Sequence, residues 1–215
     1  MRIVSVNVGR PRTVIWRGRP VTTAIFKDPV PGRVPVRHLN LEGDGQADLS
    51  VHGGTDKAVY VYSAEHYADW RRELPDLELP WGMFGENLTV EGLREDDVHV
   101  GDRLRLGSAE VVVTQPRLPC YKLGVRFGRD DIVKRFLASG RTGFYLAVTQ
   151  EGDVGTEDPV EVLARDPQGI TVGDVTRLYV RDKRNVAKLR RAIQVAALPE
   201  GWRSQFEEQL AKAAP

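Results

Sequence analysis

Short extended segments separated by glycine and proline fill the first three quarters of the chain, and this pattern is what most limits its possible folds. Residues 3–8 alternate with the period of a half-buried strand. Seven more segments have β-type composition and are bounded by turn residues; they span residues 13–16, 21–26, 58–62, 104–106, 109–114, 142–148 and 159–164. Many short strands with few helices between them predict a β-barrel or a β-sandwich.

Turn residues indicate how some of these strands connect. Gly18 and Pro20 lie between the second and third segments and predict a hairpin. A Gly-Ser pair joins the segments 104–106 and 109–114. Pro35 lacks a backbone N–H, so the short strand around it is expected at the edge of a sheet.

Two segments with a period near 3.6 residues interrupt the strands and predict helices. The first covers residues 64–74, and Ser63 precedes it as the predicted N-cap. The second covers residues 130–137. Their apolar faces comprise Tyr67, Trp70 and Leu74 in the first helix and Ile132, Val133 and Phe136 in the second.

The C-terminal quarter of the chain has helical patterning. Thr171 followed by Asp174 is a capping-box pattern, and Pro199 suits a first helical position. Three apolar stripes follow at helical spacing: Val175, Leu178 and Tyr179; Val186, Leu189, Ile193 and Ala196; Trp202, Phe206 and Leu210. The sequence therefore predicts a mainly β chain with some α-helix, in which a β-barrel domain covers residues 1–165 and a small three-helix domain covers residues 166–215.

Composition limits the classes of function. Lys and Arg total 31 against 30 Asp and Glu, a net charge of +1, and this balance argues against a general nucleic-acid binder. The single cysteine, Cys120, excludes an intrachain disulfide and any multi-cysteine metal site. No apolar run approaches the roughly 18 residues of a membrane helix, and the N-terminus is patterned as a strand and not as a signal peptide. We expect a cytoplasmic protein that contacts no membrane.

Cys120 follows a predicted strand within the stretch PRLPCYKL. Pro116 and Pro119 restrict the backbone and remove two donors, so the segment is expected to be a stiff loop at a strand end. Arg117 and Lys122 flank the thiol and would stabilise a thiolate if they also lie close in space. A thiolate is a nucleophile or a ligand for a soft metal. A lone cysteine is most often a buried structural residue, but this rigid, cationic setting favours a functional one.

The segment GDGQADLSVHGGTDK, residues 43–57, concentrates glycines and polar side chains between two predicted strands. Gly53 and Gly54 would let backbone amides approach an anion closely. Lys57 would add a point charge to a phosphate. The spacing is not that of a P-loop, and a pair of tight turns accounts for the composition equally well.

Weaker signals lie elsewhere. Glu86 and Asn87 could cap or orient a ligand at a strand start, although a plain loop explains that segment somewhat better. The basic run from Arg181 to Arg191 is most simply a solvated helix face, or else a docking surface for an acidic partner. The remaining histidines lack partners at metal-ligand spacing and are expected at the surface or satisfied in the core; these are His38, His66 and His99.

Together these stretches resemble the MOSC family, named for the C-terminal domain of molybdenum cofactor sulfurase. The resemblance lies in GDGQADLSVHGGTDK with the AVYVY strand after it, in FGENLTV and in PRLPCYKL, in this order. ITVGDVTRLYVRDK and ALPEGWRSQF are similar to the three-helix extension of one bacterial branch. The resemblance implies a barrel of the type seen in the pyruvate kinase barrel domain, in agreement with the strand pattern.

The resemblance also implies a molybdenum pyranopterin cofactor ligated by one cysteine thiolate, a position that Cys120 matches. Characterised reductases of this superfamily include the mitochondrial amidoxime reducing component and a bacterial branch that detoxifies hydroxylaminopurine. They convert N-hydroxylated compounds into the parent amine, amidine or base. This chain lacks the separate N-terminal domain of the mitochondrial enzymes, so it is more similar to the bacterial branch.

The resemblance suggests roles for the residues singled out above. Cleaving an N–O bond needs two electrons, two protons and an oxygen acceptor, and the cofactor would carry that step. Cys120 is expected to be the metal ligand and a catalytic residue. The expected clamp for the cofactor consists of Lys57, Arg117, Lys122, Gly53 and Gly54. The expected groups for proton delivery or substrate orientation are His52, Asp56 and Asn87.

The GxGxxG fingerprint of flavin and nicotinamide sites is absent, so electrons are expected from a separate flavoprotein or iron–sulfur protein. The basic run would dock an acidic donor. Exposed barrel edges and an apolar tail helix would also suit a homodimer. Two other classes stay open: a non-catalytic carrier of molybdenum cofactor or sulfur, which also needs Cys120, and a metal-free cysteine-nucleophile enzyme with His52 as its base.

Overall fold

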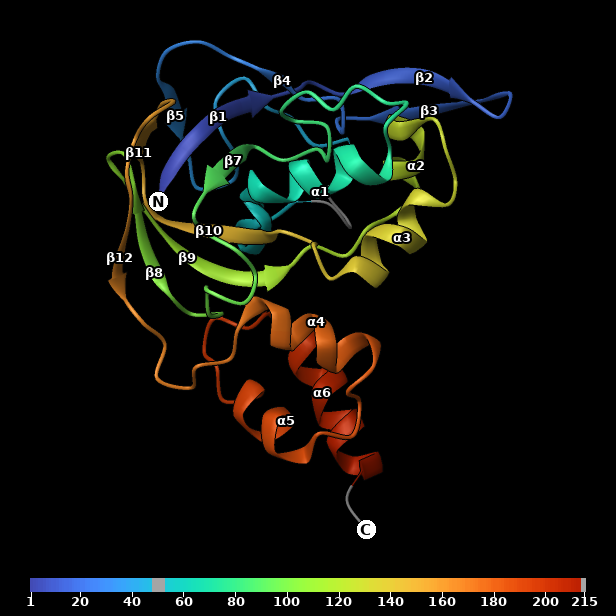
Figure 1. The fold of residues 1–215 in the computed structure, drawn as a ribbon. Helices are drawn as coiled ribbons and strands as arrows, with labels where there is room; N and C mark the ends of the chain where they lie inside the picture. Colours follow the sequence, from blue (N-terminus) through green and yellow to red (C-terminus); the bar gives the residue numbers. More distant parts are fainter. Residues whose placement is uncertain (48–52, 214–215) are drawn as a thin grey trace.

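The computed structural model describes residues 1–47 and 53–213 and confirms a sheet-rich fold with a helical C-terminal region (Figure 1). The strands of its main sheet are β1 (Arg2–Val8), β4 (Asp28–Pro29), β6 (Val59–Ser63), β7 (Leu88–Glu91), β8 (Arg103–Leu106), β9 (Ala109–Pro116), β10 (Phe144–Gln150) and β12 (Val160–Ala164). Their order is β12-β8-β9-β10-β6-β7-β1-β4. The contact of β6 with β7 is parallel, and the others are antiparallel.

The main sheet closes into the expected barrel, because the chain just before β12 pairs with β1. The Ile3 N–H donates to the Asp158 carbonyl (2.9 Å), and the Val160 N–H donates to the Met1 carbonyl (3.1 Å). Closure satisfies backbone groups that an open edge would leave unpaired. At the rim, β5 (Val34–Val36) pairs with β11 (Gly152–Val154) in a separate two-stranded sheet, which agrees with the edge position expected from its proline.

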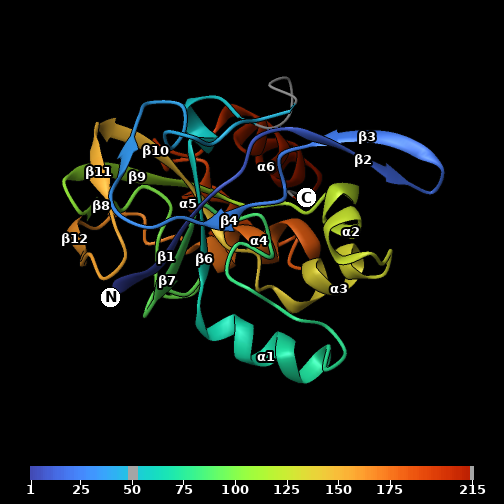
Figure 2. The ribbon, with the colours of Figure 1, turned by 90° about the horizontal axis from the view of Figure 1, so that it is seen from above.

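A hairpin of β2 (Arg12–Trp16) and β3 (Arg19–Thr23) extends away from the barrel (Figures 1 and 2). Arg17 and Gly18 form its two-residue turn with φ values of 51° and 74°, as the turn types that match strand twist require. The hairpin is confirmed. Its second strand ends at Thr23 and does not reach Phe26, because the chain turns there into the wall of a pocket.

Three helices lie on one side of the barrel: α1 (Glu65–Glu73), α2 (Tyr121–Phe127) and α3 (Ile132–Ser139) (Figure 2). They enclose an aromatic cluster that includes Tyr62, Tyr67, Trp70, Phe84 and Phe136. The two predicted helices correspond to α1 and α3. The sequence does not predict α2, because its interior Gly124 and the flanking prolines lower helix propensity.

The predicted N-cap of α1 is wrong. Ser63 is the last residue of β6, and Ala64 occupies the N-cap position without a side-chain bond. The Ser63 hydroxyl donates to Glu65 Oε2 (2.5 Å) and does not accept from the helix backbone.

The C-terminal region consists of α4 (Val172–Val180), α5 (Val186–Ala192) and α6 (Glu200–Ala213). The capping box of Thr171 and Asp174 is confirmed. Ala196 is exposed, against expectation, because α5 ends at Ala192 and Val195 takes the buried place. The buried faces of these helices share one apolar cluster with the barrel interior. No helix within the described residues is both long and apolar enough to cross a membrane.

The basic run does not form a single helix face. The exposed Arg181, Lys183 and Arg184 lie in the link between α4 and α5, whereas the exposed Arg190 and Arg191 belong to α5. Lys188 is held by Asp174, at 2.5 Å from the carboxylate, because the two helices pack together there.

Candidate cofactor and active site

A pocket at the end of β9 contains the cysteine. Cys120 is half-buried and shares the lining with Arg117 and Lys122 from its own segment. Lys57 comes from the 3-10 helix η1 (Thr55–Lys57), and Gly53 precedes it. The empty volume is about 700 Å³, part of it open to solvent. Asn87 lines the same pocket, so the structure brings six of the residues singled out from the sequence around one space.

The end of the barrel sheet positions the cysteine. Pro116 is paired with Phe144 of β10 and is the last residue of β9. Cys120 has an extended backbone (φ −119°, ψ 174°) at the N-cap of α2, and its carbonyl accepts from the Leu123 N–H (3.0 Å). The chain around Cys120 is thus a short bend between a strand and a helix, where the sequence predicts a stiff loop alone.

Arg117 is the most informative member of the pocket. Only 6% of it is exposed, and its guanidinium lies over the rings of Tyr60 (5.0 Å) and Phe136 (5.3 Å). Its buried Nη1 has no hydrogen-bond partner among the described residues. A buried guanidinium N–H without a partner is rare in proteins. Because this side chain lines the pocket, the free donor indicates a ligand with an acceptor or anionic group.

The charge of Arg117 is secure despite its burial. Burial acts to lower the pKa of Arg117, but nearby Tyr60, Tyr145 and Cys120 raise it, and the net direction is upward. Burial raises the pKa of Tyr60 well above its ordinary value and also raises that of Tyr145. At neutral pH the pocket therefore presents a fixed cation beside two neutral phenols.

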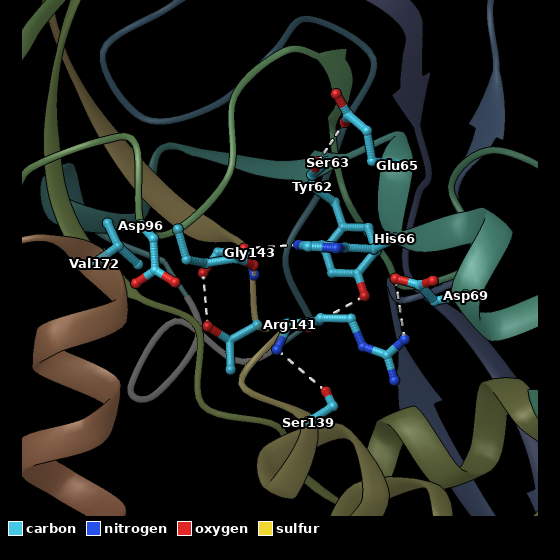
Figure 3. A network of polar contacts seen from close by, with 12 residues as sticks. Tyr62, Ser63, Glu65, His66, Asp69, Asp96, Ser139, Arg141, Gly143 and Val172 are labelled. Carbon is cyan, nitrogen blue, oxygen red and sulfur yellow. Dashed lines mark hydrogen bonds and ion pairs between the residues drawn. The ribbon is translucent and has the colours of Figure 1, made fainter. Parts of the chain in front are cut away.

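A buried polar network holds the backbone that is bonded to Arg117, and Figure 3 shows two of its members, His66 and Gly143. The backbone N–H of Arg117 donates to the Gly143 carbonyl (3.2 Å), and the backbone N–H of Gly143 donates to Glu95 Oε1 (2.7 Å). The other oxygen of Glu95 lies 2.7 Å from His66 Nε2. His66 is therefore a histidine satisfied in the core, as expected. The network fixes the start of β10, to which Arg117 is bonded.

Two lining residues were not singled out from the sequence. Lys27 and Asp44 form a buried ion pair in the pocket wall. Burial lowers the pKa of Lys27, while Asp44 opposes that shift. Asp44 belongs to the glycine-rich segment 43–57, which was a usable signal. Lys27 has none, because it lies in an irregular stretch between two strands.

Asn87 lines the pocket, but its amide is already engaged. Its Oδ1 accepts from the Tyr60 N–H (3.1 Å), and its Nδ2 donates to Asp44 Oδ2 (2.9 Å). Asn87 thus fixes Asp44 and the neighbouring strand β6. Its direct neighbour Glu86 has a different role.

Glu86 is fully buried and does not belong to the pocket lining. Its carboxylate accepts from the backbone N–H groups of Gly82 (2.9 Å) and Phe84 (3.1 Å). The hydroxyls of Tyr67 and Thr89 also donate to it. Glu86 therefore organises its own loop, which agrees with the plain-loop interpretation.

The remaining predicted residues are placed apart from the cysteine. Gly54 (φ 86°) and Asp56 line a neighbouring pocket between η1 and α6. The Asp56 side chain is exposed, and its carbonyl accepts from Thr114 Oγ1 (2.7 Å). His52 lies outside the described residues. Within residues 1–47 and 53–213, no group of three His, Cys, Asp or Glu side chains is arranged to hold a metal ion.

Two family models match this chain, and proteins of similar sequence occur in other organisms. The family model described as MOSC domain matches residues 48–161, and the model described as YiiM-like, 3-alpha helix domain matches residues 170–213. YflK of Bacillus subtilis (strain 168) is 44% identical over 204 residues, which cover 95% of this chain and 92% of YflK. A protein named "Reductase" from Gibberella moniliformis is 36% identical over 82% of this chain but only 32% of its own length.

A solved structure agrees with both family models. The crystal structure of YiiM from Geobacillus stearothermophilus superimposes with a TM-score of 0.82 at 34% identity, and the match covers 97% of this chain and 98% of that one. This chain thus resembles that YiiM in both sequence and fold over almost its entire length. The chain belongs to the MOSC family, in the branch that carries a YiiM-like three-helix domain at its C-terminus.

Proposed function

We propose that the protein is a molybdenum-cofactor-dependent reductase that converts N-hydroxylated compounds into the parent amines. The observation that carries this proposal is the shared pocket of Cys120 and Arg117, in which a buried guanidinium N–H has no partner among the described residues. Membership of the MOSC family supports the cofactor, and the similarity to a fungal protein named a reductase supports the reaction class.

The residues of the pocket fit an anionic, thiolate-ligated cofactor. The Cys120 thiolate would be the protein's ligand to molybdenum. Arg117, Lys57 and Lys122 would hold the phosphate of the pyranopterin, with Arg117 offering its fork of donors. When bound, the cofactor would supply the two electrons and accept the oxygen of the N–O bond.

The protein's own groups would orient the substrate and hold protons. The overall change R–NHOH + 2e⁻ + 2H⁺ → R–NH₂ + H₂O consumes two protons. Lys27 Nζ lies in the pocket wall beside Asp44, and burial lowers the pKa of Lys27, so its ammonium would be the group that gives up a proton there. Tyr60 and Tyr145 stay neutral, so they line the pocket without adding charge; the Tyr60 hydroxyl already donates to the Thr142 carbonyl (2.9 Å).

Hydroxylaminopurine-type bases are the substrates that this proposal favours, with amidoximes as a second class. An external flavoprotein or iron–sulfur protein would deliver the electrons. Only about a third of the fungal relative is matched by this chain, so that protein has ample length for further domains.

Elemental analysis tests the proposal most directly. Wild-type protein and Cys120→Ser are purified from a host that makes the cofactor, and molybdenum and oxidised pterin are measured in both. We expect near-stoichiometric metal in the wild type and loss of metal in the variant. With a chemical reductant as the source of electrons, only the wild type should reduce 6-hydroxylaminopurine. Circular dichroism of both proteins checks that the variant is folded.

Other outcomes select the other classes. Bound cofactor without turnover of any N-hydroxylated substrate would indicate a carrier of cofactor or sulfur. Absence of metal and pterin after incubation with excess cofactor would indicate a metal-free cysteine enzyme. Full activity of Cys120→Ser would contradict every class that depends on the thiolate.

A further inference from the structure

The pocket between η1 and the start of α6 is contiguous with the cysteine pocket. Gly53, Lys57, Leu118 and Tyr145 line both spaces. The second space has an empty volume of about 1190 Å³, part of it open to solvent. A molecule that occupies the second space can therefore extend one end toward Cys120.

Hydrogen bonds join three elements into one wall of this second space. Trp202 of α6 donates from Nε1 to Gln115 Oε1 of β9 (2.9 Å), and Gln115 Nε2 lies 3.4 Å from the Asp56 carbonyl of η1. Trp202 is 7% exposed and packs edge-on against Tyr179, with ring centroids 5.4 Å apart. The wall is thus fixed by contacts within the protein before any ligand binds.

The wall offers groups that recognise a planar polar ring. Gln115 has a second amide N–H beyond the one near Asp56, since an amide carries two donors. Gln205 is half-buried and adds a further amide from α6, and the exposed Asp56 carboxylate adds an acceptor. Tyr145 and Trp202 supply aromatic surface beside these groups.

Charge differs between the two spaces. Among the described lining residues, the cysteine pocket has Lys27, Lys57, Arg117 and Lys122 against the single acid Asp44. The second space has the shared Lys57 against Asp56. An anionic cofactor is therefore favoured in the first space, and a neutral ligand is favoured in the second.

We infer that the second space is the substrate compartment and that it holds the ring of a neutral, planar N-hydroxylated heteroaromatic base. The N–OH group then points through the shared lining toward Cys120, and the three-helix region contributes Trp202 and Gln205 to the site. This inference rests on the proposed function, and it makes the C-terminal helices part of the substrate site.

Binding of adenine, the amine product of such a base, tests the compartment in the purified protein. Titration calorimetry compares wild type, Gln205→Lys and Ser204→Lys. Both variants add one positive charge to neighbouring positions of α6, but Ser204 does not line the space. Losing an amide contact and filling the space should weaken adenine binding about 10-fold or more in Gln205→Lys, while Ser204→Lys should bind as wild type does.

Two further measurements separate this inference from the proposed function. Thr55→Lys places the same charge on η1, a different element of the same lining, and should weaken adenine binding likewise; it keeps the test valid if the α6 variant fails to fold. The molybdenum content of Gln205→Lys and of Thr55→Lys should equal that of wild type. The assignment would be overturned by unchanged adenine binding in Gln205→Lys and Thr55→Lys, or by equal weakening in Ser204→Lys. Tighter binding of benzamidine, the product of an amidoxime, than of adenine would also overturn it, as would metal loss in Gln205→Lys. None of these results affects the Cys120 test.

Discussion

Lys27 Nζ lies 2.5 Å from both carboxylate oxygens of Asp44, and the two side chains are only 8% and 2% exposed. The same carboxylate accepts from the Gly9 N–H (2.9 Å) and from Asn87 Nδ2 (2.9 Å). Asp44 is therefore the point at which four separate segments meet in the pocket wall. A buried charge held in this way is stabilised only while its partners stay in place.

Replacement of Lys27 by methionine should lower the free energy of unfolding by about 3–5 kcal/mol, because it leaves the Asp44 charge buried without its cation. The double variant Lys27→Met/Asp44→Asn should lose less than the sum of the two single changes. The free energies of unfolding of Lys27→Met, Asp44→Asn and the double variant are measured by urea denaturation. Arg33→Met removes an exposed arginine from its ion pairs and should cost clearly less; an equal loss in both variants would contradict the burial argument.

Arg117→Lys should weaken retention of the cofactor about 10- to 100-fold, since the fork of donors is lost while the charge remains. The measurement is molybdenum and pterin retained after gel filtration. Arg126→Lys is the matched control, because Arg126 is also partly buried over an aromatic ring but does not line the pocket. Equal retention by both variants would remove Arg117 from the clamp.

Gly143→Ala should destabilise the protein strongly. Gly143 has a φ of 62°, and an added Cβ would lie 2.4 Å from the Val61 carbonyl oxygen. The left-handed conformation costs an alanine about 1–2 kcal/mol, and overpacking adds about 1–3 kcal/mol. Gly140 has a similar φ of 71° with open space around it. Gly140→Ala should therefore show only the cost of the left-handed conformation, without the cost of overpacking. Equal losses of unfolding free energy would mean that β10 shifts to admit the Cβ.

Sequence patterns captured most of the barrel because most of its strands alternate or are apolar over their own few residues; they missed β4, which consists of two exposed residues. They located Cys120, Arg117 and Lys57 because glycine, proline and cationic residues mark those segments. They missed Lys27 because its role comes from a contact with Asp44, 17 positions along the chain. They also placed Asp56 with the cysteine, whereas η1 turns it toward α6, a contact between distant segments that local patterns do not encode.

The ionised Asp174 carboxylate should stabilise the folded protein at neutral pH and lose this effect at acidic pH. Burial acts to raise the pKa of its carboxyl, but hydrogen bonds from Lys188 and Arg177 lower it below the ordinary 3.8. Because the folded value is depressed, the stabilisation is present above about pH 4 and is lost as the pH falls through the folded pKa. Asp174→Asn should be less stable than wild type at pH 7, and the difference should shrink toward pH 2. Parallel melting temperatures of the two proteins across that range would contradict the linkage.

The exposed cations between α4 and α5 should govern reduction by an acidic electron donor. Lys183→Glu/Arg184→Glu reverses two exposed charges, whereas Lys188 is excluded because it holds Asp174. Reduction by the donor, followed by stopped flow at low ionic strength, should slow about 10-fold, and its salt dependence should flatten. Arg19→Glu/Lys134→Glu carries the same change of charge on exposed positions of the hairpin and α3, so its rate should stay near that of wild type. Equal slowing in both double variants would mean that net charge, and not a docking surface beside α5, controls the encounter.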